Sequence, residues 1–143
     1  MDTAANAGVI WRLVEDAVNT NRLDLLTGFV HADVRVHPGT PGTAPATESI
    51  KELATAFRRF HAVFPDLHVT IEDVVAEGDR VAARWIATGT HSAELAGIAA
   101  TGRAVTWGGT DIYRLVDGRI AEWWRNDDFV WLLQQLEAPA LPA

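Results

Sequence analysis

The hydrophobic pattern of this chain changes its period at residue 68, and two tight-turn signals follow. Up to that point apolar residues recur at helical spacing, whereas beyond it they alternate with polar ones. Gly78-Asp79 and Asp117-Gly118 each separate two such alternating segments, and dipeptides of Gly with Asp favour hairpin turns. The chain is therefore predicted to contain two consecutive β-hairpins. The predicted strands are residues 68–77, 80–91, 104–115 and 119–127.

The rest of the chain is predicted to be mostly helical. The predicted helices cover residues 4–19, 22–30, 48–63 and 129–137. Thr47 is the expected N-cap of the third helix, with Glu48 in its first turn. Val34 and Val36 alternate with polar residues, which indicates one additional short strand.

This order of elements predicts an α+β domain, with the N-terminal helices packed on the concave face of a curved antiparallel sheet. A chain of 143 residues fits a single domain, residues 1–143. Helices laid across a concave sheet leave a closed-ended cavity, which is a natural site for a small molecule.

Composition excludes several classes of site and partner. The chain has no cysteine, which rules out disulfides, thiolate metal sites and a cysteine nucleophile. A net charge of -7 argues against a nucleic-acid partner. Apolar runs are too short for a membrane span, and the start MDTAANAG lacks the basic residues of a secretory signal. We expect a soluble, cytoplasmic protein.

The second hairpin gathers aromatic and acidic residues on one face. A two-residue turn at Asp117-Gly118 pairs residue 113 with 122 and residue 111 with 124. In that register one face carries Trp107, Gly109, Asp111, Tyr113, Glu122, Trp124, Asn126 and Asp128. The opposite face carries Trp123, Arg125 and Asp127, and a slip of one residue exchanges the two faces. Gly108-Gly109 indicates a close approach to the backbone, or a bulge.

Asp128 is the leading candidate for an acid or base. Partial burial beside aromatic rings raises the pKa of a carboxyl group and makes it a better proton carrier. Asp128 also directly precedes the apolar residues of the final helix, so it has a second possible role as helix cap, for which Asp127 competes. For Asp111 the alternative to a site role is a structural carboxylate bonded within the core.

Two histidines are secondary candidates. His37 ends the short strand next to Pro38, at the expected mouth of the cavity, and His91 follows Gly89-Thr90. The remaining histidines show no metal-ligand spacing with each other or with the acids, so we expect no metal site. Phosphate-binding and dinucleotide-binding motifs are also missing, so we expect no cofactor.

Several of these segments together resemble the SnoaL-like polyketide cyclases, within the nuclear-transport-factor-two-like superfamily. The matching motifs are Phe-Pro-Asp at 64–66, Gly-Asp-Arg-Val at 78–81, Gly-Thr-His at 89–91, Thr-Gly at 101–102 and Leu-Leu-Gln-Gln-Leu at 132–136. The resemblance implies a cone-shaped α+β fold and ring closure by intramolecular aldol condensation without a cofactor. It also implies an acid/base Asp four residues after a Trp, which matches Asp128 after Trp124. The chain departs from the family in its polar stretch Arg125-Asn126-Asp127.

The resulting hypothesis is a polyketide cyclase in which Asp128 removes and returns the proton. His37, Asn126 or Tyr113 is expected to hydrogen-bond the enolate oxygen, with His37 and Asn126 as the catalytic partners. The residues expected to contact the substrate are Trp85, His91, Trp107, Asp111, Tyr113 and Trp124. Alternatives are a cofactor-free hydroxylase, an isomerase or epoxide hydrolase that uses Asp111 as a second carboxylate, and a non-catalytic small-molecule-binding protein.

We also expect a homodimer. An exposed tryptophan on the outer sheet face is unfavourable in a monomer, and members of the resembling family are commonly dimers. This interpretation places Trp123 near the contact between the two copies.

Overall fold

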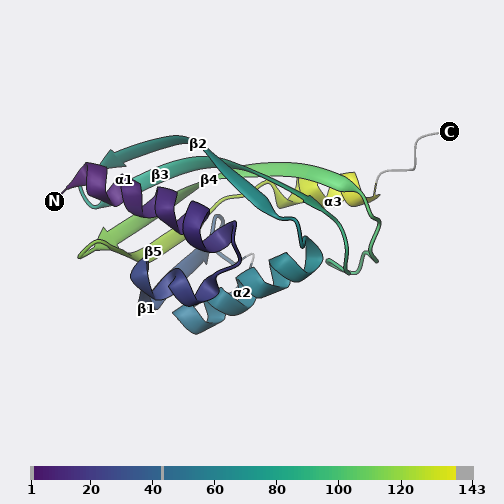
Figure 1. The fold of residues 1–143 in the computed structure, drawn as a ribbon, viewed down its shortest axis with the longest axis horizontal. Helices are drawn as coiled ribbons and strands as arrows, with labels where there is room; N and C mark the ends of the chain where they lie inside the picture. The colour runs from purple at the N-terminus through teal and green to yellow at the C-terminus, as the bar shows by residue number, and fades with distance from the viewer. Residues whose placement is uncertain (1, 43, 138–143) are drawn as a thin grey trace.

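The computed structural model describes residues 2–42 and 44–137 and contains three α-helices and one five-stranded sheet within that part of the chain (Figure 1). The elements in chain order are α1 (Thr3–Arg12), η1 (Leu13–Val18), η2 (Leu23–Gly28), β1 (Val30–Pro38), α2 (Ile50–Val63), β2 (His68–Glu77), β3 (Arg80–Thr90), β4 (Ala104–Val116), β5 (Arg119–Arg125) and α3 (Phe129–Glu137).

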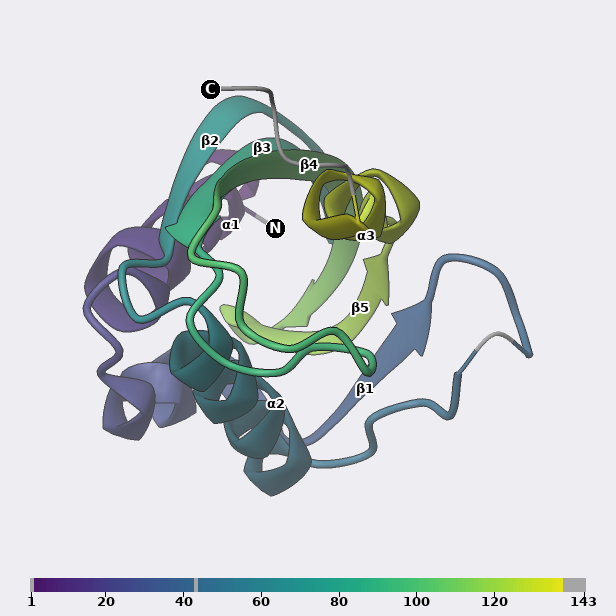
Figure 2. The same ribbon diagram turned by 90° about the vertical axis from the view of Figure 1, so that its right-hand side faces the viewer.

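The strands are ordered β1-β5-β4-β3-β2 in one sheet. Figure 2 shows this sheet curving strongly, with α1 and α2 across its open side and α3 beside the end of the hairpin formed by β4 and β5. The predicted α+β class is confirmed. The sheet is mixed rather than wholly antiparallel, because β1 pairs in parallel with β5.

Both predicted hairpin turns are present. Asp117 and Gly118 have φ angles of 51° and 76°. A two-residue type I′ hairpin turn requires positive φ at both central residues. Gly78 has a φ of 58° in the first turn, and Asp73 pairs with Arg84 as predicted, with a salt bridge of 2.6 Å. The predicted pairing of residue 72 with 85 is wrong, because Glu72 is an extra residue and Ile71 faces Trp85.

The N-terminal helices differ in detail from their prediction. The expected helix over 4–19 is α1 followed by the π-helical segment η1, and the expected helix over 22–30 is the shorter 3₁₀ helix η2. Ser49, not Thr47, caps α2: its hydroxyl accepts a hydrogen bond from the amide of Glu52. Thr47 instead forms a pair of backbone hydrogen bonds with Val36 on β1.

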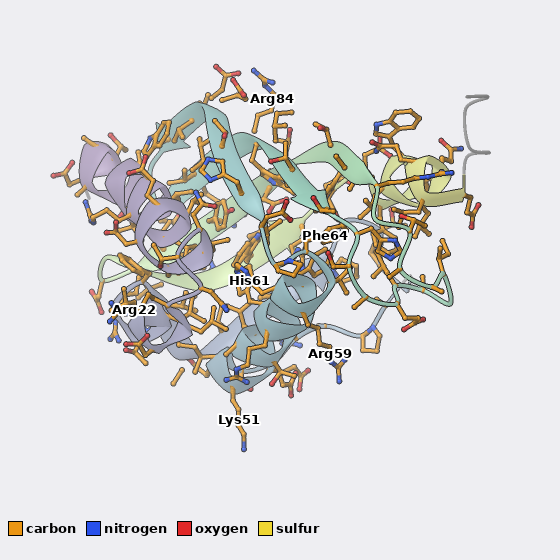
Figure 3. The ribbon with its side chains drawn as sticks, turned by 45° about the vertical axis from the view of Figure 1, so that its right-hand side comes forward. Arg22, Lys51, Arg59, His61, Phe64 and Arg84 are labelled. Atoms are coloured by element: carbon orange, nitrogen blue, oxygen red, sulfur yellow. The ribbon has the colours of Figure 1, made fainter. Side chains whose placement is uncertain are left out.

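Helix α2 covers the cavity side of the sheet with one face and meets solvent with the other. His61 and Phe64 are buried at its C-terminal end, while Lys51 and Arg59 extend away from the body of the protein (Figure 3). This division follows from the helical spacing of apolar residues in its sequence. The helix thus forms one wall of the interior.

Candidate active site

A cavity lies between the helices and the concave face of the sheet. Its atom-free space is about 790 Å³, including the part that opens to solvent. The lining is almost entirely apolar and aromatic, and its charged members are Asp111 and Arg125. The residues that line it are Leu13, Val14, Val18, Leu53, Ala56, Phe57, Phe60, Leu67, Val69, Ile71, Ala83, Trp85, Ala87, Trp107, Asp111, Tyr113, Trp123 and Arg125.

An irregularity in β5 decides which residues of the second hairpin reach this cavity. Near the turn the pairing is the predicted one, with Leu115 opposite Ile120. Ala121 is then an extra residue, and from that point the register shifts by one, so that Tyr113 faces Trp123. The predicted pairing of 113 with 122 and of 111 with 124 is therefore wrong. For β4 the predicted face is the one that lines the cavity.

Because of that shift, β5 presents the opposite face from the one predicted. Trp123 and Arg125 line the cavity, whereas Trp124 and Glu122 lie on the outer side of the sheet. Sequence reasoning missed the first two as site residues. The polar stretch that begins at Arg125 was the one signal in the sequence for a polar group at this position. The adjacent residues Trp123 and Trp124 hid the correct register, because either register places a tryptophan on the cavity face.

Asp111 is the more deeply buried of the two charged residues in the cavity wall, with only 3% of its surface exposed. Its Oδ2 accepts a hydrogen bond of 2.9 Å from the indole N–H of Trp123, and its Oδ1 accepts one of 3.0 Å from the backbone N–H of Asn126. Burial raises the pKa of the Asp111 carboxyl, while these donors and the charge of Arg125 oppose that rise.

Aromatic rings surround this carboxyl group. The rings of Tyr113 and Trp123 pack at 4.9 Å between centroids, and Phe57 of α2 lies 6.2 Å from the ring of Trp123. Trp85 and Trp107 complete the wall, as predicted for a substrate surface. Burial and the neighbouring charge of Asp111 raise the pKa of the Tyr113 hydroxyl well above 10.0, so this group stays protonated as a donor.

The predicted acid/base Asp128 is not part of the cavity wall. Its side chain is exposed, and its Oδ1 accepts a hydrogen bond of 3.0 Å from the backbone N–H of Trp131. It therefore caps α3, the alternative that the sequence left open. Asp127 is half-buried, and the side chain of Asn126 is exposed, although its backbone N–H holds Asp111.

His37 and Trp124 lie together on the outer side of the sheet, contrary to the prediction. Their rings stack at 5.5 Å, and His37 Nε2 is 2.8 Å from a carboxylate oxygen of Glu122. The hydrogen bond from His37, together with Arg114, lowers the pKa of Glu122. The pair is a surface network, and the cavity does not include it.

His91 is buried but does not line the cavity. Its Nδ1 accepts a hydrogen bond of 3.1 Å from the backbone N–H of Thr101, and its ring lies 6.2 Å from that of Phe64. These contacts fix the loop after β3 against the end of α2. Of the nine predicted site residues, the structure brings together Trp85, Trp107, Asp111 and Tyr113, and separates Asp128, His37, Asn126, Trp124 and His91 from them.

The described residues hold neither a metal-binding cluster nor a membrane-spanning helix. Across 2–42 and 44–137, no three His, Asp or Glu side chains are grouped so that they could hold a metal ion. In the same ranges, none of the helices has the length and apolar character needed to span a bilayer.

Comparison with known proteins fits this architecture. The SnoaL-like polyketide cyclase family matches residues 8–136. The chain belongs to the SnoaL-like polyketide cyclase family. The chain matches no curated protein in the comparison.

Solved structures of similar proteins share the whole domain. IdmH of Streptomyces antibioticus, a candidate polyketide cyclase, is 35% identical with a TM-score of 0.80, over 93% of this chain and 99% of that one. TsrD of Streptomyces laurentii is 29% identical with a TM-score of 0.84, over 97% and 99%. AclR of Streptomyces galilaeus, a candidate hydroxylase, is 27% identical with a TM-score of 0.83, over 99% and 87%. These solved structures therefore share the fold of this chain over nearly its whole length.

Proposed function

We propose that this SnoaL-like protein is a cofactor-free polyketide cyclase that closes a ring by intramolecular aldol condensation, with Asp111 as the acid/base. One observation carries the proposal: a buried carboxyl group with a raised pKa faces an aromatic cavity. Such a group is a stronger base when ionised than an exposed Asp and a usable acid when protonated.

The proposed reaction conserves all atoms of the substrate. The Asp111 carboxylate removes a proton from the carbon next to a carbonyl, and the resulting enolate attacks a second carbonyl to form the new C–C bond. The proton then returns from Asp111 to the aldol oxygen. The hydrogen bonds from Trp123 and Asn126 take one lone pair on each carboxylate oxygen. Trp85 and Tyr113 also interact with this carboxylate, so the substrate replaces one of these two side chains when it gives its proton to Asp111.

Tyr113 is the proposed donor to the enolate oxygen. Its hydroxyl lies in the cavity wall close to Asp111 and remains protonated. A fixed donor at the position where negative charge develops stabilises the transition state, and removal of one such donor typically costs about 10²–10³-fold in rate. Of the three donors expected from the sequence, Tyr113 lines the cavity, whereas His37 and Asn126 do not.

The cavity favours a flat, apolar substrate and disfavours the hydrolase alternative. Its aromatic walls suit a polyketide-like skeleton, and its few polar groups suit orientation of that skeleton. A two-carboxylate epoxide hydrolase needs a second acid, yet among the described lining residues the other charged group is Arg125. The hydroxylase alternative remains open, because AclR shares this fold.

The decisive assay follows the mass of the product. Purified protein is incubated with aromatic β-polyketone substrates with and without oxygen, and products are separated by liquid chromatography with mass spectrometry. We expect a product of unchanged mass, or one that has lost water, formed at equal rates in both atmospheres. Formation of a product that carries one more oxygen atom, dependent on oxygen, would establish the hydroxylase instead. Absence of any product across the set, with the ligands bound unchanged, would favour the binding protein.

The raised pKa of Asp111 predicts an unusual pH dependence of stability. The folded state holds the Asp111 proton more tightly than the unfolded chain, whose ordinary pKa is 3.8. At pH values between the unfolded-state pKa and the raised folded-state pKa of Asp111, the folded protein binds more protons than the unfolded chain. The contribution of Asp111 to the free energy of unfolding therefore falls as pH rises through this range. Urea unfolding of wild type and Asp111→Asn at several pH values should show wild type gaining relative stability on acidification. The other carboxyl groups are present in both proteins, so a difference that is constant with pH would contradict the raised pKa.

The homodimer, the cytoplasmic location and the absence of a cofactor remain predictions. Trp123 cannot supply the dimer contact, because it is buried against Tyr113 and hydrogen-bonded to Asp111. The proposed contact stays on the outer sheet face, where Ile112 is 44% exposed.

A further inference from the structure

Arg125 carries an unpaired positive charge into the cavity. It lines the cavity and is half-buried. Within residues 2–42 and 44–137 its guanidinium forms neither a hydrogen bond nor an ion pair. A guanidinium presents five N–H donors in a planar fork, so all of them are available to a bound molecule.

Asp111 is the obvious partner for this charge, yet it does not pair with it. Ile112 faces Trp124 and Gly109 faces Asp127, so the same register places Arg125 opposite Asp111. The two oxygens of Asp111 are already held by the indole of Trp123 and the backbone of residue 126. Arg125 acts on Asp111 through its charge alone.

An unpaired cation beside apolar walls is unfavourable unless an anion accompanies it. The described lining offers no carboxylate except Asp111, whose oxygens already accept other hydrogen bonds, so a bound anion is the partner that the N–H donors of Arg125 lack. Arginine matches a carboxylate with two parallel hydrogen bonds, which fixes the orientation of that group in a plane. The aromatic and aliphatic walls then accommodate the remainder of the molecule.

We propose that Arg125 binds the carboxylate of an otherwise apolar, flat ligand, so that the substrate of this cavity is a free acid rather than an ester. This acid is the substrate class that we propose for the cyclase. Its reaction rests on the proposed function, whereas its binding by Arg125 does not. Arg125 is thus the residue that selects the substrate, and Asp111 is the one that reacts with it.

Binding of matched probes tests this assignment. Naphthalene-2-carboxylate and its methyl ester differ only in charge, and their binding is followed by quenching of the fluorescence of Trp85, Trp107 and Trp123 and by calorimetry. We expect wild type to bind the acid at least about tenfold more tightly than the ester. Arg125→Gln should abolish that preference, and Arg125→Lys, which keeps a charge without the fork, should retain part of it.

Arg84→Gln is the matched control. Arg84 lies on the outer side of the sheet, extends away from the interior and pairs with Asp73 (Figure 3). Its loss removes an equal charge without touching the cavity, so the preference for the acid should persist. Because the guanidinium of Arg125 forms no hydrogen bond or ion pair with the described residues, Arg125→Gln should also unfold at a temperature close to that of wild type, and a marked drop would indicate a structural role instead.

Three outcomes overturn the inference. They are equal binding of acid and ester by wild type, a preference for the acid that survives Arg125→Gln, and binding of neither probe. Failure of the proposed cyclase has a different signature, since Asp111→Asn would then leave turnover unchanged while wild type still prefers the acid.

Discussion

Replacement of Asp111 by Asn is expected to reduce turnover by about 10²–10⁴-fold, the range typical for loss of a general acid/base. Asn keeps the size and planarity of the side chain but can neither accept nor return the proton. Its carbonyl oxygen can still accept one of the two hydrogen bonds from Trp123 and Asn126 that hold the native carboxylate. Steady-state kinetics on a substrate found by the mass assay measures the effect, with circular dichroism to show that the fold is kept.

Asp128→Asn provides the critical comparison. Asn and Asp cap helices about equally well, so the start of α3 should remain intact. Because Asp128 is exposed outside the cavity, we expect its replacement to leave turnover close to wild type. A large loss in Asp128→Asn combined with an active Asp111→Asn would reject Asp111 as the acid/base and restore the assignment that the resemblance implies.

Gly109→Ala is expected to destabilise the protein by about 1–3 kcal/mol, the usual cost of forcing extra atoms into a packed site. A Cβ at Gly109 would lie 2.7 Å from the backbone oxygen of Asn126 and 2.8 Å from Cα of Asp127. These are backbone atoms, so the end of β5 has to move, and the N–H of residue 126 that holds Asp111 moves with it. Turnover should therefore fall as well. Chemical unfolding and kinetics measure the two effects.

Gly28→Ala is the control for this change. A Cβ at Gly28 meets no atom within 4 Å, so the same added methyl group should leave both stability and turnover nearly unchanged. If Gly109→Ala behaved like Gly28→Ala, the close approach of β5 to Gly109 would not be a constraint on the site. The sequence had indicated such an approach at Gly108-Gly109, and the approaching segment is the chain's own residues 126–127.

The secondary structure was largely predictable because its signals are local. Strands β2 to β5 and helices α2 and α3 lie within a few residues of their predicted ranges. Each was marked by its own periodicity and by turn residues such as Gly78 and Gly118, which have positive φ. Ser49 replaced Thr47 as a cap because Thr47 was drawn into backbone pairing with β1, a tertiary contact that local sequence does not reveal.

The candidate site was predictable on β3 and β4 but not on β5, and Trp85 of β3 lines the cavity as expected. Trp107, Asp111 and Tyr113 of β4 line the cavity as expected, since their alternation is regular. On β5 the extra residue Ala121 reversed the faces. Trp123 and Trp124 are identical in hydrophobicity, so burial of an apolar ring could not select between the two registers.

From its own pattern the sequence determined the α+β elements, both hairpin turns and a family resemblance over most of the chain. The tertiary structure decided which acid faces the cavity and which cation accompanies it. The physical reason is that side-chain direction along a strand has a period of two, so one inserted residue exchanges the faces. That exchange placed Trp123 and Arg125 beside Asp111 and left Asp128 to cap a helix in solvent.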